Sequence, residues 1–243
     1  MPTIDDVSND IWEKLPPHDQ DLEYMARLYE DSTISDTGSG NELQRRLGTI
    51  LDASSDGRNG GVTHFSGIFA GVHDGGFQKA FKDPWPSSDN QVGHFTTAVD
   101  MGFRPARTFM LIPPPARKVR DWPGQTFVSV EEWFCMALIV GHEQVADDAW
   151  VANPRAGLAA DGDEVGTFYA ALPSVRLNPS SDVSLSTQCL KGIRIGTGRG
   201  NSIQDLNLSL YGFQFGKFIR KGDMTTRAAA AKWLRTDLGG VAP

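Results

Sequence analysis

Two stretches near the start of this 243-residue chain place their apolar residues three or four positions apart. That spacing predicts a helix over residues 19–29 and another over residues 42–51, each with one buried face. The apolar positions are Leu22, Met25, Ala26 and Tyr29 in the first stretch and Leu43, Leu47 and Ile50 in the second. Residues 31–41 and 53–61 are polar and rich in glycine, which predicts loops.

Three further helices are predicted by a helix-start signature. Each begins with a serine followed three residues later by Gln, Glu or Asp, an arrangement that satisfies backbone N–H groups at a helix start. The pairs are Ser88 and Gln91, Ser129 and Glu132, and Ser202 and Asp205. The first helix is expected over residues 89–101 with Gly102 as its C-cap, and the third over 203–219. A final helix is expected over 226–238, around its alanine run.

The second of these helices contains nine consecutive apolar or small residues, Trp133 to Gly141. A helix that is apolar on every side is expected in the centre of a core. A buried strand is the competing interpretation, because periodicity alone does not separate the two. The cap at Ser129 and the length of the run favour a helix.

The other segments give weaker patterns. Residues 62–81 are apolar but interrupted by glycines, and a helix is expected in their first part. Residues 108–112 predict a short strand or buried coil, and residues 190–195 a short strand or an extended connector. Residues 147–183 are expected to be mostly irregular, with a short apolar stretch at 168–172. Residues 1–18 predict an N-terminal arm or a short helix.

These patterns together predict a mainly α protein, a single-domain multi-helix bundle over residues 1–243 with at most a few short strands. The chain has 26 Gly and 14 Pro, so long Gly/Pro-rich loops are expected. We find no internal repeat and no shift in composition that would divide the chain.

The net charge of −7 argues against nucleic acid as a partner, because phosphate binding needs a basic face. The basic run at residues 117–120 is interpreted as a solvated loop. The two cysteines, Cys135 and Cys189, do not form a disulfide framework, and Cys135 is expected to be a buried apolar residue.

Targeting signals are also lacking in the sequence. No stretch reaches the ~18 apolar residues that a membrane span requires. Residues 1–6 are acidic and do not resemble a signal peptide. The protein is therefore expected to be cytoplasmic as synthesised, with export by a route that reads no N-terminal signal as the alternative.

A candidate site arises where the predicted helices carry polar residues. His142 and Glu143 follow the apolar run directly, where the side chains leave the core, and burying them requires partners. His94 lies near the start of the first capped helix, and Asp205 shares a face with the small residues Ser209, Gly212 and Gly216 that another helix can approach. If these helices converge, His94, His142, Glu143 and Asp205 form one catalytic site.

Each of these residues also has a purely structural interpretation. Asp205 can complete the capping box with Ser202. His94 can be a satisfied histidine at the edge of the core. His142 and Glu143 can belong to a structural polar network.

Two chemistries fit such a cluster. His94, His142 and an acidic group can bind a divalent metal ion that activates water. Alternatively, without any cofactor, Glu143 acts as general acid or base and a histidine tunes it. We favour the second, because no two ligands have recognisable metal spacing: the zinc-protease motif needs His at position 146, where the chain has Ala146. No Gly-x-Ser-x-Gly elbow is present either.

The sequence therefore predicts a hydrolase acting on a small molecule, a glycan or a peptide. The alternative is a non-catalytic interaction protein, such as an effector, an immunity protein or an assembly component, which docks a protein partner. That alternative predicts a closed histidine cluster with all of its hydrogen bonds made within the fold.

A second candidate site is the glycine-rich segment before the third capped helix. Backbone N–H groups at such a helix start can hold an anion. The residues are Arg194, Gly196, Gly198, Arg199 and Gly200. A flexible loop explains the same composition, and the segment matches neither a P-loop nor the Gly-x-Gly-x-x-Gly pattern.

Three of these features resemble a pattern in small bacterial envelope proteins of the YfiM type. The matching pieces are His94-Phe95, Glu143 at the end of an apolar helix, and the helix from Ser202 to Gly216. Similar helices occur in bacterial polymorphic-toxin proteins. The chain departs where that family places Lys before Glu, since His142 stands there. The resemblance implies that the three helices act as one unit, and it implies no particular activity.

Overall fold

The computed structural model describes residues 2–15, 20–55, 67–82, 91–111, 129–144 and 202–240. Within these ranges the side chains of Phe109, Leu111, Glu143, Gln144 and Ile203 are not described. The described residues form eight α-helices and no strand, which confirms the mainly α prediction. The helices are α1 (Ile4–Lys14), α2 (Asp21–Glu30), α3 (Glu42–Ser54), α4 (Gln91–Phe103), α5 (Pro105–Leu111), α6 (Val130–Gln144), α10 (Ile203–Lys221) and α11 (Arg227–Trp233).

Short helical turns complete the described part. Two 3-10 turns, η1 (Gly67–Phe69) and η2 (Lys79–Phe81), lie between α3 and α4. A π-helical turn, η6 (Leu234–Leu238), continues α11. The predicted final helix over residues 226–238 is thus confirmed, with Thr226 as its N-cap.

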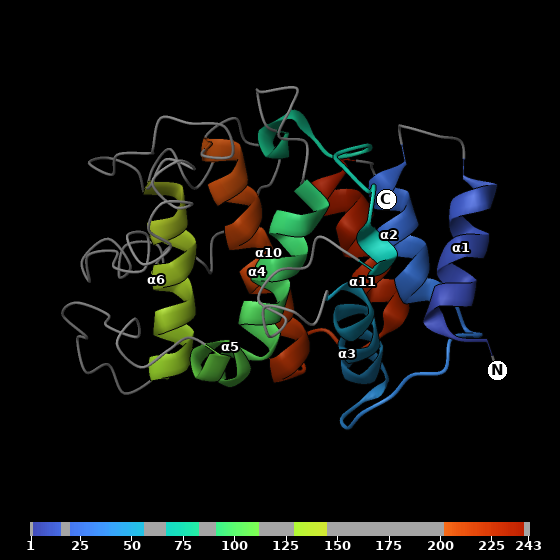
Figure 1. Cartoon of the computed structure of the whole chain (residues 1–243), viewed down its shortest axis with the longest axis horizontal. Coiled ribbons are helices and arrows are strands. Elements are labelled where there is room, and N and C mark those ends of the chain that lie inside the picture. The colour runs from blue at the N-terminus through green and yellow to red at the C-terminus, as the bar shows by residue number, and fades with distance from the viewer. Residues whose placement is uncertain are drawn as a thin grey trace.

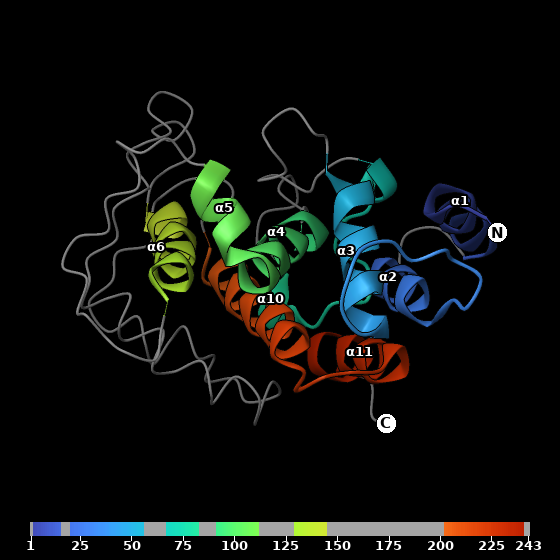
Figure 2. The same ribbon diagram turned by 90° about the horizontal axis from the view of Figure 1, so that it is seen from below.

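The helices are arranged in a row rather than around one axis (Figure 1). α6 lies at one side, next to α5 and α10, and α1 lies at the opposite side. The view from below shows α10 crossing beneath α4, with α11, α3 and α2 following toward α1 (Figure 2). α6 is buried all round, from Trp133 to Val140, as its apolar run predicts. The centre of the described helices is nevertheless the pair α4 and α10.

The α4–α10 pair is held at short range by glycines. A Cβ on Gly212 would stand 2.6 Å from the carbonyl oxygen of Phe95, and one on Gly216 would stand 2.1 Å from that of Val99. Gly102 of α4 approaches the backbone of Phe213 in the same way. Glycine is required at these positions because no side chain fits between the two backbones. The groove that the small residues of the third capped helix predict is therefore filled by α4.

An aromatic cluster joins this pair to the rest of the core. Phe215 of α10 lies 5.7 Å from Tyr29 of α2, 5.7 Å from Phe95 of α4 and 4.8 Å from Trp233 of α11, measured between ring centroids. Tilted and edge-to-face pairs at such distances stabilise by about 0.5–1.5 kcal/mol each beyond the area they bury. The cluster therefore fixes four helices around one ring.

The N-terminal segment forms a helix packed on the core. Thr3 caps α1 through a reciprocal capping box with Asp6. Val7 and Ile11 are buried, and α1 contacts both α2 and α3. Of the two predictions for residues 1–18, the short helix is the one that the structure has.

Three local predictions were wrong. Residues 105–111 form α5 instead of a strand or coil, because Pro105 stands at the first helical position, where it favours a helix start. The apolar segment predicted to begin as a helix has, in its described residues 67–81, two 3-10 turns and no α-helix, because Gly67 and Gly71 adopt positive φ angles that interrupt a helix. Gly102 is not a C-cap: α4 continues through Phe103, and Gly102 instead provides the close approach to α10.

Other predictions fall outside the described residues. These are the cap at Ser88, the basic run at 117–120, the irregular and extended segments between 147 and 195, the fate of Cys189 and the glycine-rich segment before α10. Within the described part, no helix combines the length and the apolar character that crossing a membrane would need.

Candidate functional site

Three helix ends meet on one side of the described fold. α4 and α10 run in the same direction. Gln91 at the start of α4 bonds to Asp205 near the start of α10, and Gly102 near the end of α4 packs on Phe213 further along α10. α6 runs the opposite way: Glu132 in its first turn pairs with Arg220 in the last turn of α10. The end of α6 therefore lies beside the beginnings of α4 and α10.

The ion pairs at the far end fix the orientation of α6. Glu132 is buried, and its carboxylate pairs with Arg220 and, at 3.6 Å, with Lys217. Its backbone N–H donates to Ser129 Oγ at 3.1 Å, which confirms the predicted serine cap. An acidic residue at a helix start and basic residues at a helix end both match the helix dipoles. These pairs hold α6 antiparallel to α10, and so place His142 at the candidate site.

His94 and His142 come together at this end. Their ring centroids are 5.8 Å apart and their planes are inclined by 41°. The two residues are 48 positions apart in sequence, so only the packing of α4 against α6 brings them into contact. His94 is 8 % exposed, whereas His142 is half-buried, so His142 is the imidazole nearer to solvent.

Burial keeps His94 neutral. Loss of solvation, with a smaller contribution from the adjacent His142, lowers the pKa of His94 to about 3. A neutral imidazole has one N–H donor and one nitrogen acceptor, so His94 can orient a neighbour without carrying charge. His142 lies in the last turn of α6, where the helix dipole favours a cation.

Asp205 is fully buried and faces α4. Its Oδ1 accepts a hydrogen bond of 2.9 Å from Gln91 Nε2, and its backbone N–H donates to Ser202 Oγ at 3.0 Å. The serine cap of α10 is thus confirmed, while one carboxylate oxygen serves a bond between helices. Gln91 precedes His94 by about one helical turn, so the bond between Gln91 and Asp205 lies about one turn of α4 away from His94.

The structure brings two of the four residues predicted for a catalytic site into contact, His94 and His142. Asp205 bonds instead to Gln91, about one turn before His94. Glu143 lies in the last turn of α6, at the same helix end, but its side chain is not described. The predicted anion-binding residues lie outside the described part. They are Arg194, Gly196, Gly198, Arg199 and Gly200.

Sequence reasoning assigned Gln91 only to a helix cap and missed its place in the site. It is fully buried, and its Oε1 has no hydrogen-bond partner in the described part of the fold. An available signal was its spacing, because a residue one turn before His94 lies on nearly the same face of the helix.

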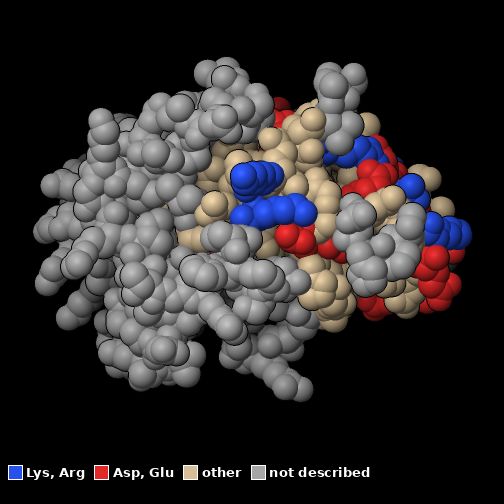
Figure 3. Space-filling model, turned by 90° about the horizontal axis from the view of Figure 1, so that it is seen from above, with Lys and Arg blue, Asp and Glu red and all other residues tan. Residues whose placement is uncertain are grey.

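Two further features bear on what the site can bind. Among the described residues, no three His, Cys, Asp or Glu side chains form a group that can hold a metal ion. The face seen from above has Lys and Arg side chains next to Asp and Glu, and no broad basic area over the residues described there (Figure 3). Lys82 and Asp74 form an ion pair with their charged atoms 3.6 Å apart.

The neutral state of His94 predicts a specific loss of stability in acid. In the unfolded chain the imidazole has a pKa of 6.5, and in the fold about 3. The unfolded state therefore binds a proton that the fold does not, and stability falls as pH drops through this window, by about 1.4 kcal/mol per pH unit. Between pH 7 and pH 5 this amounts to about 2 kcal/mol.

Urea denaturation at a series of pH values measures this dependence. His94→Gln should reduce the acid-induced loss over the same range by about 2 kcal/mol, whatever its effect at neutral pH. An unchanged slope in the variant would show that His94 is not buried in its neutral form.

Comparison with known proteins gives no relative from which a function can be transferred. No family model matches the chain, and neither the curated proteins nor the solved structures include a match.

Proposed function

We propose that the protein is a hydrolase whose acid–base site lies where α4, α6 and α10 meet. The observation that carries the proposal is the contact between His94 and His142, with the bond from Gln91 to Asp205 one turn away. A buried neutral imidazole beside a half-buried one is suited to orienting a proton carrier. Enzymes commonly place such groups at low dielectric on rigid elements.

The proposed roles follow from position. Glu143 is the general acid or base, and His142 beside it in sequence assists the proton transfer. His94 is a positioning residue that orients His142. Asp205 is a positioning residue that fixes Gln91 at the start of α4.

The test is hydrolysis of a panel of chromogenic esters, phosphodiesters, glycosides and peptides between pH 5 and pH 8. Glu143→Gln should lower kcat/KM by about 100-fold or more, because a positioned acid or base contributes that much. The matched control is Glu131→Gln, which changes a carboxylate in the first turn of the same helix, at the opposite end.

Two results would reject the hydrolase. One is a folded wild-type protein that cleaves no member of the panel. The other is activity that Glu143→Gln and Glu131→Gln reduce equally, since the loss would then not depend on the proposed site.

A non-catalytic interaction protein is the second candidate. The deep burial of His94 and Asp205 favours it, because the side chains of a structural polar network are inaccessible to solvent and to a substrate. In that case the wild-type protein has no hydrolytic activity, and His142→Ala should only lower the free energy of unfolding. Measuring the unfolding free energy beside the panel separates the two functions.

A further inference from the structure

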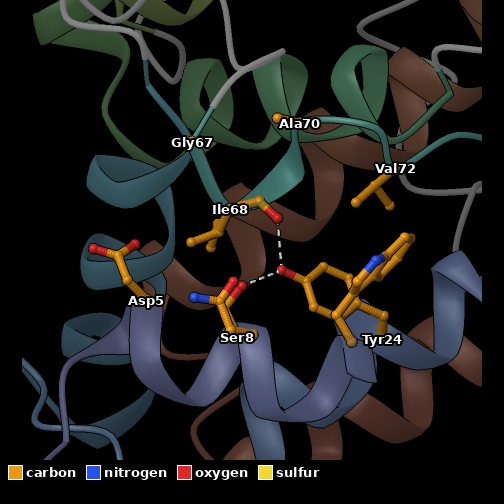
Figure 4. A pocket seen from close by; sticks show the side chains of 9 residues that line it. Asp5, Ser8, Tyr24, Gly67, Ile68, Ala70 and Val72 are labelled. Atoms are coloured by element: carbon orange, nitrogen blue, oxygen red, sulfur yellow. Dashed lines mark hydrogen bonds between the residues drawn. The ribbon is translucent and has the colours of Figure 1, made fainter. Parts of the chain in front are cut away.

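A hollow of about 400 Å³ lies far from this site, between α1, α2 and the segment from Gly67 to Val72 (Figure 4). Volumes of about 300–1,000 Å³ are typical of small-ligand sites. Asp5, Ser8, Asn9 and Trp12 line it from α1, and their spacing of three, four and seven residues puts them on one face of the helix. The hollow is thus a product of α1 packing on the core.

The floor of the hollow accepts hydrogen bonds. Tyr24 Oη donates its hydrogen to the carbonyl oxygen of Ile68 at 2.6 Å and lies 2.6 Å from Ser8 Oγ (Figure 4). Burial raises the pKa of Tyr24 to about 12, so the phenol keeps its single proton at neutral pH. Ser8 must then donate to Tyr24, and its lone pairs are left to accept from a ligand.

The walls add a negative charge and an aromatic surface. Asp5 is exposed and lines the hollow from α1. Its negative charge contributes to raising the pKa of Tyr24. Trp12 is 42 % exposed and packs edge-to-face on Tyr24, with ring centroids 5.2 Å apart. An accepting floor, a carboxylate and an indole form a surface that favours a cation with N–H donors.

We propose that this hollow binds a primary ammonium group on an aliphatic stem, with the nitrogen donating to Ser8 Oγ and the Asp5 carboxylate and the stem packed on Trp12. The ammonium has three donors and no acceptor, which matches the acceptors that Ser8 Oγ and the Asp5 carboxylate present to the hollow. A free alkylammonium ion and the lysine side chain of a protein partner share this chemistry. The site is independent of the proposed hydrolase.

Titration with pentylammonium, followed by the indole N–H signal of Trp12 in NMR spectra, tests the site. The chain has six tryptophans, and the signal that disappears in Trp12→Phe is assigned to Trp12. Saturable shifts at millimolar concentration are expected, and 1-pentanol, which has the same stem without the charge, should bind at least about fivefold more weakly. Equal binding of both, or no saturable shift, would overturn the proposal.

Variants locate the binding. Asp5→Asn and Trp12→Ala should each weaken pentylammonium binding about fivefold. The control is Asp10→Asn, which removes a carboxylate of the same helix that pairs with Lys14 at 2.6 Å and does not line the hollow. If Asp5→Asn and Asp10→Asn weaken binding equally, the effect reflects the overall charge of α1 and the site is refuted.

A second titration distinguishes the two sources of the ligand. A blocked tripeptide Gly-Lys-Gly should bind at least as tightly as pentylammonium if the site receives a partner's lysine, and its acetyllysine form should not bind. Tighter binding of the free ion assigns the site to a small alkylammonium ligand. If the acetylated peptide binds as tightly as the unmodified one, the ammonium is not the recognised group.

Discussion

Replacing Gly216 with alanine is expected to lower the free energy of unfolding by about 3 kcal/mol or more. The new methyl group would stand 2.1 Å from the carbonyl oxygen of Val99 and 2.9 Å from the backbone nitrogen of Phe103. Both neighbours are backbone atoms of α4, so no side-chain rotation relieves the overlap. α4 and α10 would have to move apart along their whole contact.

The same displacement would disturb the candidate site. The side chains of Gln91 and Asp205 are hydrogen-bonded across this helix pair at 2.9 Å. The rings of Phe95 and Phe215 pack together between the same two helices. Gly216→Ala should therefore reduce hydrolytic activity as well as stability. Urea denaturation and the substrate panel measure the two effects on the same preparation.

Gly48 provides the matched control. It lies within α3, and a Cβ there meets no atom within 4 Å. Gly48→Ala should stabilise the protein by up to about 1 kcal/mol, because alanine restricts the unfolded chain and favours a helix. If Gly48→Ala and Gly216→Ala had similar effects, close packing of α4 on α10 would not be the reason for glycine at position 216.

Replacing Arg46 with methionine is expected to destabilise the protein by about 3–5 kcal/mol. The guanidinium is fully buried in α3 and pairs with Asp36. It also donates to the carbonyl oxygens of Leu28 and Asp31 at 2.7 Å, at the end of α2. Methionine fills much of the same space but would leave a buried carboxylate and these oxygens without their donor.

The position of Arg46 explains why the effect should be large. The last carbonyl groups of a helix have no partner within it, and a cation there also matches the helix dipole. Arg46 thus caps the C-terminal end of α2 and anchors the loop at residues 31–41. Arg27→Met is the control, because Arg27 is exposed and its ion pair among the described residues is an i,i+4 pair with Glu23, expected to contribute about 0.3–0.5 kcal/mol. Equal losses in thermal or urea denaturation would contradict a special role for Arg46.

The helices followed from the sequence because their signals are local. Leu43, Leu47 and Ile50 repeat with the helical period, and all three are buried on one face of α3. Ser129 and Ser202 cap their helices through bonds that span only three residues. Gly222 ends α10 in the left-handed conformation that a C-cap favours.

The predictions that failed depend on contacts between distant segments. Gly102 satisfies the local pattern of a helix end, yet the backbone of α10 requires the glycine there. The role of Gln91 arises from a bond to a residue 114 positions away. The burial of Arg46 was not predicted, because its bonds to Leu28 and Asp31 depend on how α3 packs on α2. Periodicity along one segment carries no information on such pairs.

The residues of the candidate site came from the sequence, whereas the contact between its two histidines came from the structure. The helical positions of His94 and His142 were available from the sequence, whereas their contact depends on α6 running antiparallel to α10. That direction is fixed by Glu132 and the basic end of α10, 88 residues apart for the pair with Arg220. Charges at helix ends are visible in a sequence, but which ends meet is not.

The contact between the two imidazoles is the element on which the proposed site depends most directly. A nuclear Overhauser spectrum of protein carrying ¹³C-labelled histidine measures it, with His142→Gln identifying the signals of that residue. We expect a cross-peak between ring protons of His94 and His142, because their centroids lie 5.8 Å apart. A folded protein in which both rings are assigned and no cross-peak joins them would contradict the convergence of α4 and α6.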